Sequence, residues 1–440
     1  MATLIVNKDE TNLSLTWMAR GWMLLMPLLA LPNSGLGRTT PVGVFDISDY
    51  LLVIWIPLLL LDRKWRFTTL GDRLAPWMMA FFVWAVIGVA SINARYDYGS
   101  DYHTMLFSTV KLAKFMVYVL AGSLAASRIP GVERIKAFHW SLLAAALVQG
   151  VGMMLSPNKN NSDEILELYG YKSVNGAAVT EVVLLAYLVL LAAEGFGSAY
   201  WRKAVSAIGI IGMVAVFTSQ SRGAWVAAIC VLLYIVAVRG IHKRTMMIAV
   251  AAVVLVSASY LMAPEFRDKV DFTLHPELRM ETGETRDIHG VDQGGRIDTW
   301  MTELKVYADA PIVGTGFYHR GGLTSLWLTG SHNFFLQMLL ETGIVGFVIW
   351  VGIFVRIWAD SDSFQGHRYH MTVPMHGAIV AAVSGLMGGE YFYGGFPMLA
   401  MVLVYATTSS LRVSNLSVRG ERVRRPIRFM LRTERVRINR

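Results

Sequence analysis

The sequence predicts an all-α, polytopic membrane protein with about twelve transmembrane helices, because apolar runs long enough to cross a bilayer recur along it. Its composition points the same way: of 440 residues, 54% are hydrophobic and only 16% are charged. A soluble enzyme carries more charge than this. One long hydrophilic stretch, residues 264–331, interrupts the apolar runs and is the candidate for a subdomain outside the bilayer.

The hydrophilic stretch divides the predicted spans into two groups. Nine spans precede it within residues 1–263, three follow it within residues 332–411, and residues 412–440 form a basic tail. The spans are placed at 18–32, 45–61, 75–92, 107–127, 138–155, 177–195, 203–219, 223–238, 244–263, 332–358, 372–389 and 391–411.

The distribution of lysine and arginine predicts the orientation. An even number of spans puts both termini on one side, and one set of alternate short loops carries fourteen of these residues against five in the other. The richer set is cytoplasmic by the positive-inside rule, so residues 264–331 are expected outside. Ten more arginines lie after Ser410. They could contact nucleic acid, but anchoring of a cytoplasmic tail on anionic lipid is the favoured interpretation.

The external loop is acidic and contains one predicted helix. Eleven acidic residues outnumber seven basic ones. Within 296–308, apolar side chains at Ile297, Trp300, Leu304 and Tyr307 recur at helical spacing. Pro311 and a glycine turn follow, so the helix is expected to stop there.

The start of span 332–358 combines several polar residues. His332 stands where the loop becomes a membrane helix, and Asn333, Gln337 and Glu341 follow at i, i+4 spacing on one face. His332 is either part of a helix cap or a general base, because an imidazole titrates near external pH. Glu341 is either structural or functional, since a carboxylate within the bilayer is costly. The following Gly343 and Gly346 favour close helix packing.

Three basic residues on the external side are candidates for binding an anion. Arg222 lies in the short turn 218–223 between two spans, and it is either a snorkelling side chain or a guanidinium fork for phosphate. Arg296 follows two glycines at the start of the loop helix, as a surface residue or a second phosphate contact. Lys172, near Asn175, is an interfacial lysine or a further phosphate contact.

The sequence predicts no metal and no cofactor. Asp360-Ser361-Asp362 forms a D-x-D pattern, which can hold a divalent ion, but the predicted topology places it in the cytoplasm, opposite His332. The acidic residues and histidine at 287–292 have no ligand spacing typical of a metal site. The single cysteine, Cys230, excludes intramolecular disulfides and thiolate clusters.

These motifs resemble those of the O-antigen ligase and polymerase superfamily, in the same order and over about residues 219–346. The first 200 residues resemble that family only as a run of helices, with Lys172 and Asn175 a loose similarity. The matching motifs are Ser221-Arg222-Gly223-Ala224, Arg296-x-x-x-Trp300, Pro311-x-x-Gly314-x-Gly316, and His332-Asn333 with Glu341-x-Gly343.

The resemblance implies a GT-C-like glycosyltransferase of the bacterial inner membrane, active at the periplasmic face. Such a ligase transfers a glycan from undecaprenyl diphosphate to a sugar hydroxyl of lipid A–core oligosaccharide without metal or nucleotide sugar. Arg222 and Arg296 would clamp the diphosphate, and His332 would be the catalytic base. Lys172, Asn333 and Glu341 would contribute to substrate binding.

Three alternatives remain open at the level of sequence. An O-antigen polymerase would use a second lipid-linked glycan as acceptor, and a protein O-oligosaccharyltransferase would use a protein. The short arginine-rich tail argues against the latter, which often has more sequence after its last span. A transporter would also suit twelve spans with Glu341 and Glu390 inside the membrane, although a long acidic loop with motif arginines is unusual for one.

Overall fold

The computed structural model is helical in the parts of the chain that it describes. Four of the described helices are long and apolar enough to cross a membrane, which identifies a membrane protein. The described residues are 38–40, 43–45, 71–93, 131–155, 174–219, 221–240, 257, 261, 267, 295–316, 333–361 and 372–387.

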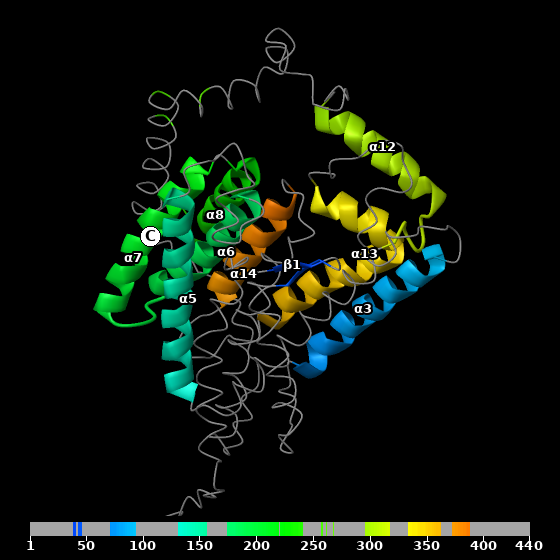
Figure 1. Cartoon of the computed structure of the whole chain (residues 1–440). Helices are drawn as coiled ribbons and strands as arrows, with labels where there is room; N and C mark the ends of the chain where they lie inside the picture. The colour runs from blue at the N-terminus through cyan, green and yellow to red at the C-terminus, as the bar shows by residue number, and fades with distance from the viewer. Residues whose placement is uncertain are drawn as a thin grey trace, which may run out of the picture.

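Five helices form one bundle (Figure 1). Its members are α5 (Gly131–Leu155), α6 (Val174–Ala193), α7 (Ala199–Thr218), α8 (Arg222–Arg239) and α14 (Thr372–Leu386). Helix α6 contacts each of the other four and is buried on nearly all sides, which explains why its sequence is apolar all round rather than striped.

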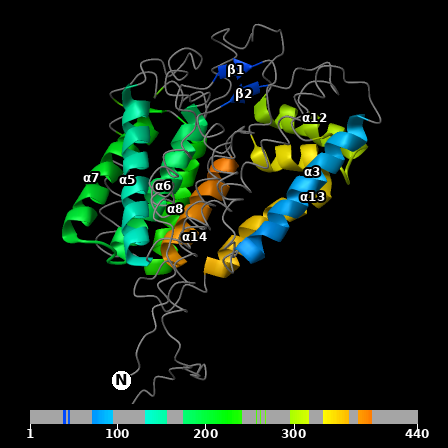
Figure 2. The ribbon, with the colours of Figure 1, turned by 60° about the horizontal axis from the view of Figure 1, so that its bottom comes forward.

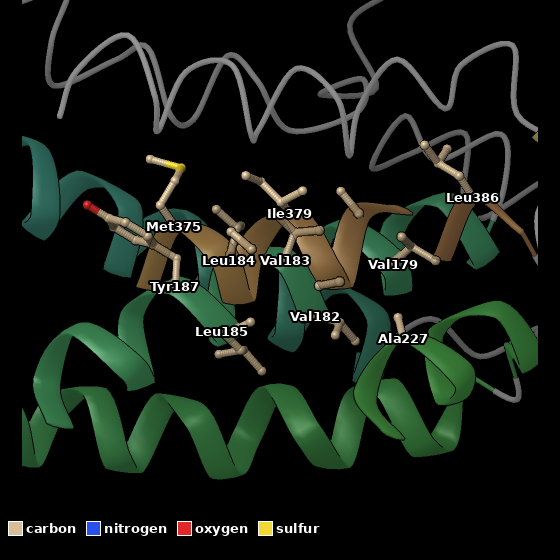
Figure 3. Close-up of a cluster of buried hydrophobic side chains, with 14 of the residues drawn as sticks. Val179, Val182, Val183, Leu184, Leu185, Tyr187, Ala227, Met375, Ile379 and Leu386 are labelled. Atoms are coloured by element: carbon tan, nitrogen blue, oxygen red, sulfur yellow. The ribbon is translucent and has the colours of Figure 1, made fainter. Parts of the chain in front are cut away.

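The core of this bundle lies between α6 and its neighbours (Figure 3). Val179 and Val183 of α6 pack toward Ile379 and Leu386 of α14, while Ala227 of α8 approaches from the other side. Small residues on α8 and α14 let the helix backbones come close, as expected where lipid removes most of the hydrophobic drive between helices.

A second group of helices lies beside the bundle (Figure 2). It consists of α3 (Gly71–Asn93), α12 (Gly295–Asp309) and α13 (Phe334–Ser361), and α13 joins the two groups by contacting α14. Helix α12 packs along the first part of α13, at one end of the group. The described residues also include a short antiparallel hairpin, β1 (Arg38–Thr40) with β2 (Gly43–Phe45), which the sequence analysis did not foresee.

Seven of the predicted spans correspond to described helices, which confirms the helical class. The span expected at 138–155 begins seven residues earlier, at Gly131, and the one at 332–358 runs instead over Phe334–Ser361. The predicted loop helix is also present, as α12. Apart from the isolated positions 257 and 261, the remaining spans lie outside the described residues, as does the basic tail. These spans are 18–32, 45–61, 107–127, 244–263 and 391–411. The count of twelve and the GT-C likeness therefore stay predictions.

Helix α13 is not the continuous helix that its apolar sequence suggests. Gly343 has φ +64° and ψ −177°, which breaks the helix after its first nine residues. Only glycine adopts this conformation without steric cost. A break in a helix leaves backbone amides and carbonyls without their helical partners, and where the break is buried these groups need other partners.

The turn after α12 fills the break. The backbone N–H of Thr315 donates to the carbonyl of Leu340 at 2.8 Å, and that of Gly316 donates to Glu341 at 3.0 Å. In the other direction, the N–H of Ile344 donates to the carbonyl of Pro311 at 2.9 Å.

Helix α3 supplies a further partner for the break. The indole N–H of Trp84 donates to the carbonyl of Thr342 at 2.8 Å. Segments from two other places in the sequence, the turn after α12 and Trp84 of α3, therefore satisfy the backbone groups that the break in α13 exposes.

Two glycines make this contact possible. Gly314 has φ +77°, and a Cβ on it would lie 2.5 Å from the carbonyl oxygen of Glu341. A Cβ on Gly343 would lie 2.7 Å from the amide nitrogen of Gly314 and would overlap Ile312. The predicted close packing between helices is found at Gly346, where a Cβ would lie 2.7 Å from Cδ1 of Trp84 in α3, whereas Gly343 packs closely against a turn and not against a second helix.

Replacing Gly314 with alanine is expected to destabilise the protein through two additive effects. The left-handed backbone costs a residue with a Cβ about 1–2 kcal/mol, and overlap in a packed site costs about 1–3 kcal/mol more. The measurement is the thermal unfolding midpoint of the purified protein in detergent, together with its level in the membrane.

Two glycines provide matched controls. Gly195 has φ +82° but nothing within 4 Å of a Cβ, so Gly195→Ala carries only the backbone cost. Gly209 is helical and its nearest neighbour would be 3.6 Å away, so Gly209→Ala carries neither cost. Equal unfolding midpoints for Gly314→Ala and Gly195→Ala would refute the contribution of the overlap.

Candidate functional site

The turn between α7 and α8 positions Arg222 as the first residue of a helix. Ser221 is the N-cap of α8, and its hydroxyl accepts the N–H of Ala224 at 3.3 Å. Ser219 fixes the turn from the other side, since its hydroxyl donates to the carbonyl of Val216 and accepts the N–H of Ser221. Both serines are buried. The backbone at Arg222 is therefore held rigidly, while its side chain lies outside the described part of the structure.

Helix α12 places Arg296 in its first turn, directly after Gly295. The side chain of Arg296 again lies outside the described residues. The orientation of α12 differs from the sequence prediction: Leu304, expected on the buried face, is 42% exposed, whereas Glu303 is 3% exposed. The helix is thus rotated so that a carboxylate faces inward, because its docking is set by the turn that follows it rather than by an apolar stripe.

Helix α13 begins at Phe334, two residues after His332. Asn333 caps it: the side-chain oxygen accepts the N–H of Phe335 at 3.0 Å and that of Leu336 at 3.3 Å. Of the two predicted roles at this position, the capping role thus belongs to Asn333. His332 itself lies outside the described residues, but its place in the chain is the residue that leads into the N-cap.

Of the three polar residues predicted to line one face of α13, the last two interact with each other. The side-chain amide of Gln337 donates to the carboxyl oxygen Oε1 of Glu341 at 2.7 Å, and both side chains are buried. Asn333 does not join this pair, because its side-chain oxygen bonds the helix backbone. Glu341 also precedes the break, where its own carbonyl accepts the N–H of Gly316. The pair therefore connects the start of α13 with the turn at residues 311–316, which is called the docked turn below.

The four basic candidates share one feature of local structure: each stands at or just before the N-terminal end of a helix. Arg222 opens α8 and Arg296 lies in the first turn of α12, while Lys172 and His332 precede the first residues of α6 and α13 by two positions. Unpaired backbone N–H groups and the helix dipole make such ends favourable for anions. Lys172 lies outside the described residues.

No group of three or more histidine, cysteine, aspartate or glutamate side chains within the described ranges could hold a metal ion. The D-x-D pattern lies at the end of α13, where Asp360 is buried and forms an ion pair of 3.0 Å with Arg356, one turn earlier. Asp362 lies outside the described residues. Arg356 thus supplies a positive charge for Asp360 without a metal.

One buried carboxyl group was not predicted from the sequence. Glu181, in α6, is the only charged residue between Val174 and Ala193 and is fully buried. A lone acidic residue in an apolar run of this length is itself a signal, and it could have been used to find this position.

The docked turn was visible in the sequence only as a glycine motif. Pro311, Gly314 and Gly316 were expected to end a helix, and they do so. Their additional contact with α13 could be found only in the three-dimensional structure, because the spacing of the glycines does not indicate which element they pack against.

A comparison with known proteins addresses the resemblance directly. No curated protein sequence matches the chain. Residues 205–351 match a family model described as O-antigen ligase. The matched segment contains most of α7, the whole of α8 and α12, and α13 to beyond its break. It thus includes every motif on which the resemblance was based, and over these residues the chain is similar to the O-antigen ligase family.

Proposed function

We propose that this protein is an O-antigen ligase, a glycosyltransferase that moves a glycan from undecaprenyl diphosphate to a sugar hydroxyl of lipid A–core oligosaccharide. The observation that carries the proposal is the family match over residues 205–351, with Arg222, Arg296 and His332 each at or next to the start of a helix. The site is proposed to face the periplasm of a bacterial inner membrane, with both chain termini in the cytoplasm.

The proposed reaction is a single displacement. His332 accepts the proton of the acceptor hydroxyl as its oxygen attacks the anomeric carbon of the donor sugar. The bond from the anomeric carbon to the phosphate oxygen breaks, and undecaprenyl diphosphate leaves with the electron pair. Both substrates are anchored in lipid, so holding them at one interface lowers the entropic cost of their encounter.

The two arginines are proposed to stabilise the charge that develops on the departing diphosphate. A guanidinium group matches two phosphate oxygens at once, which an ammonium group cannot do. Arg222 and Arg296 stand in the first turns of α8 and α12, where the free N–H groups add to the positive potential. This arrangement would supply the charge compensation that a divalent metal provides in other transferases. Lys172 is proposed as a further phosphate contact.

Asn333 and Glu341 are proposed to act mainly by positioning. Asn333 fixes the start of α13 and thereby the backbone next to His332. Glu341 is 2% exposed, and through Gln337 it ties that helix start to the docked turn. The donor's polyprenyl chain would lie against the apolar surfaces of neighbouring helices.

Reconstitution tests the proposed function. Purified protein in liposomes, given undecaprenyl-diphosphate-linked glycan and lipid A–core, is expected to form glycan-bearing lipopolysaccharide, and addition of a chelator is expected to leave the rate unchanged. Absence of transfer, or uptake of solute without transfer, would overturn the proposal. Loss of activity with chelator would overturn its metal independence.

A deletion strain separates ligase from polymerase. Loss of long chains from lipopolysaccharide, with lipid-linked polymer retained, is the result expected for a ligase. Lipopolysaccharide that carries one repeat unit would instead identify a polymerase, and transfer to protein would identify an oligosaccharyltransferase.

Substitution of His332 by alanine is expected to reduce transfer about 10²- to 10⁴-fold, the range for loss of a general base. The rate is measured in the reconstituted assay, with protein level in the membrane as a check on folding. His242→Ala provides the matched control, since this histidine lies in a loop predicted to be cytoplasmic. Near-normal transfer by the His332 variant would remove the base assignment.

Substitution of Arg222 by lysine is expected to reduce transfer about 10²- to 10³-fold, comparable with removing one donor from an oxyanion site. The positive charge is retained in this variant, so a loss of transfer activity would be due to the missing pair of planar guanidinium donors. Arg202→Lys is the control, because Arg202 bonds the carbonyls of Gly195 and Gly197 at the opposite end of α7. Full activity of the Arg222 variant would exclude the clamp.

A further inference from the structure

Glu181 is a fully buried carboxyl group inside the five-helix bundle. The side chain lies on the second turn of α6 and is 0% exposed. Neither carboxyl oxygen has a hydrogen-bond partner among the described residues. A carboxyl group without a partner at this depth is costly in either form, and most costly when it is ionised. A carboxyl group in an otherwise apolar helix therefore needs a bound partner that pairs or neutralises it.

The carboxyl group lies in a close-fitting slot between α5 and α7. A Cβ added to Gly150 of α5 would lie 3.4 Å from Oε1 of Glu181, and one added to Gly212 of α7 would overlap the same oxygen. The Cβ on Gly212 would also approach Leu185 to 2.7 Å. The two glycines therefore admit the carboxyl group by leaving out their own side chains.

Gln149 places a second unpaired polar group beside this slot. It directly precedes Gly150, is 0% exposed, and its side-chain N–H donates to the carbonyl of Ala177. Ala177 lies one turn before Glu181 on the same face of α6. The amide oxygen of Gln149 has no partner among the described side chains and backbone, so it can accept a hydrogen bond from a protonated carboxyl directly or through one water.

The charged groups of the facing helices lie toward other levels of the bundle. Glu133, Arg134 and Lys136 of α5 stand about 20 Å or more along the helix from Gln149, at 1.5 Å per residue. Arg202 and Lys203 of α7 stand about 14 Å along the helix from Gly212. His139 of α5 is bonded to Tyr187 at 3.0 Å, nearly two turns along α6 from Glu181.

The two remaining neighbours of α6 carry few charged groups. Helix α14 contains His376, which stacks on Trp358. Helix α8 has Arg222 at its start and Arg239, paired with Glu194, at its end. Of these groups, only Arg222 begins a helix that packs on α6 from the end at which Glu181 lies, so pairing with Arg222 is the rival that an experiment must exclude.

A metal cation fits the slot poorly. Hard cations take six or more oxygen ligands, whereas the unpaired side-chain oxygens that the described residues place here are two from Glu181 and one from Gln149. A Cβ on Gly212 would overlap Oε1, so the backbone of this glycine lies close to the oxygen and leaves no room for a coordination shell on that side. A proton needs no shell and removes the charge.

We propose that Glu181 and Gln149 form a proton-binding site in the bundle, in which the carboxyl group of Glu181 is held in its neutral, protonated form. Release of the proton requires water to reach the slot, and therefore requires α5 or α7 to move away from α6. Protonation of one side chain is thus coupled to the packing of three helices. This site does not depend on the proposed transferase activity.

Infrared difference spectroscopy of the reconstituted protein tests the site. Subtraction of Glu181→Gln from the unaltered protein at neutral pH is expected to leave the carbonyl stretch of a protonated carboxylic acid. The same subtraction with Glu194→Gln is expected to leave none, because Glu194 forms an ion pair with Arg239. Absence of the band in the Glu181 subtraction, as an ion pair with Arg222 would cause, overturns the proposal.

Two measurements on the unaltered protein remain informative even if the Glu181 variant fails to fold. The acid band is expected to persist when the medium is made mildly alkaline, and to shift only slowly after transfer to heavy water, since exchange needs the helices to part.

A second variant tests the slot itself. Gly212→Ala, which displaces the carboxyl oxygen, is expected to shift the band or accelerate its exchange. Loss of the band on adding sodium at constant pH would identify a metal cation as the occupant and overturn the proton site.

Discussion

Backbone hydrogen bonding at the break in α13 is the constraint on which the second group of helices depends. A membrane helix that stops and restarts exposes polar backbone groups where water is absent. Here the turn at Pro311–Gly316 supplies two N–H donors and one carbonyl acceptor, and Trp84 supplies a third donor. The turn after α12 and helix α3 are therefore both joined to α13 by hydrogen bonds to its backbone, and this joint lies nine residues after the start of α13.

The same joint connects elements that carry residues distant in sequence, which are proposed to serve one reaction. Helix α12 ends directly before the docked turn, so the helix that carries Arg296 is attached to the helix that follows His332. The Gln337–Glu341 pair extends the connection toward the cap at Asn333. Arg222 belongs to the other group of helices, which meets α13 through α14. A site that uses all three residues would span the boundary between the two groups.

Much of the architecture could be predicted from sequence, because long apolar runs and their stops have few structural solutions. The extent of α12 followed from apolar spacing and Pro311, and the helices from Gly131 to Arg239 followed from hydropathy. Three features did not follow. The positive φ of Gly343 is a property of its docked partner, the inward face of α12 is set by that docking rather than by Leu304, and the surroundings of Glu181 come from glycines on two other helices. For the candidate site, the structure gives the backbone positions of Arg222, Arg296 and Asn333, whereas the chemistry proposed for them rests on the similarity to the family.

The glycine pair Gly314 and Gly343 has a consequence for protein engineering and for divergence among relatives. Each glycine occupies the space that a side chain on the other would need, although 28 residues separate them in the chain. A loop exchanged between two relatives to alter glycan preference must therefore either retain residues 311–316 from the recipient or bring its own version of Gly343 and Trp84. Recombination points placed before Pro311 respect this dependence, and those placed between Gly316 and Gly343 divide a single structural unit between two parents.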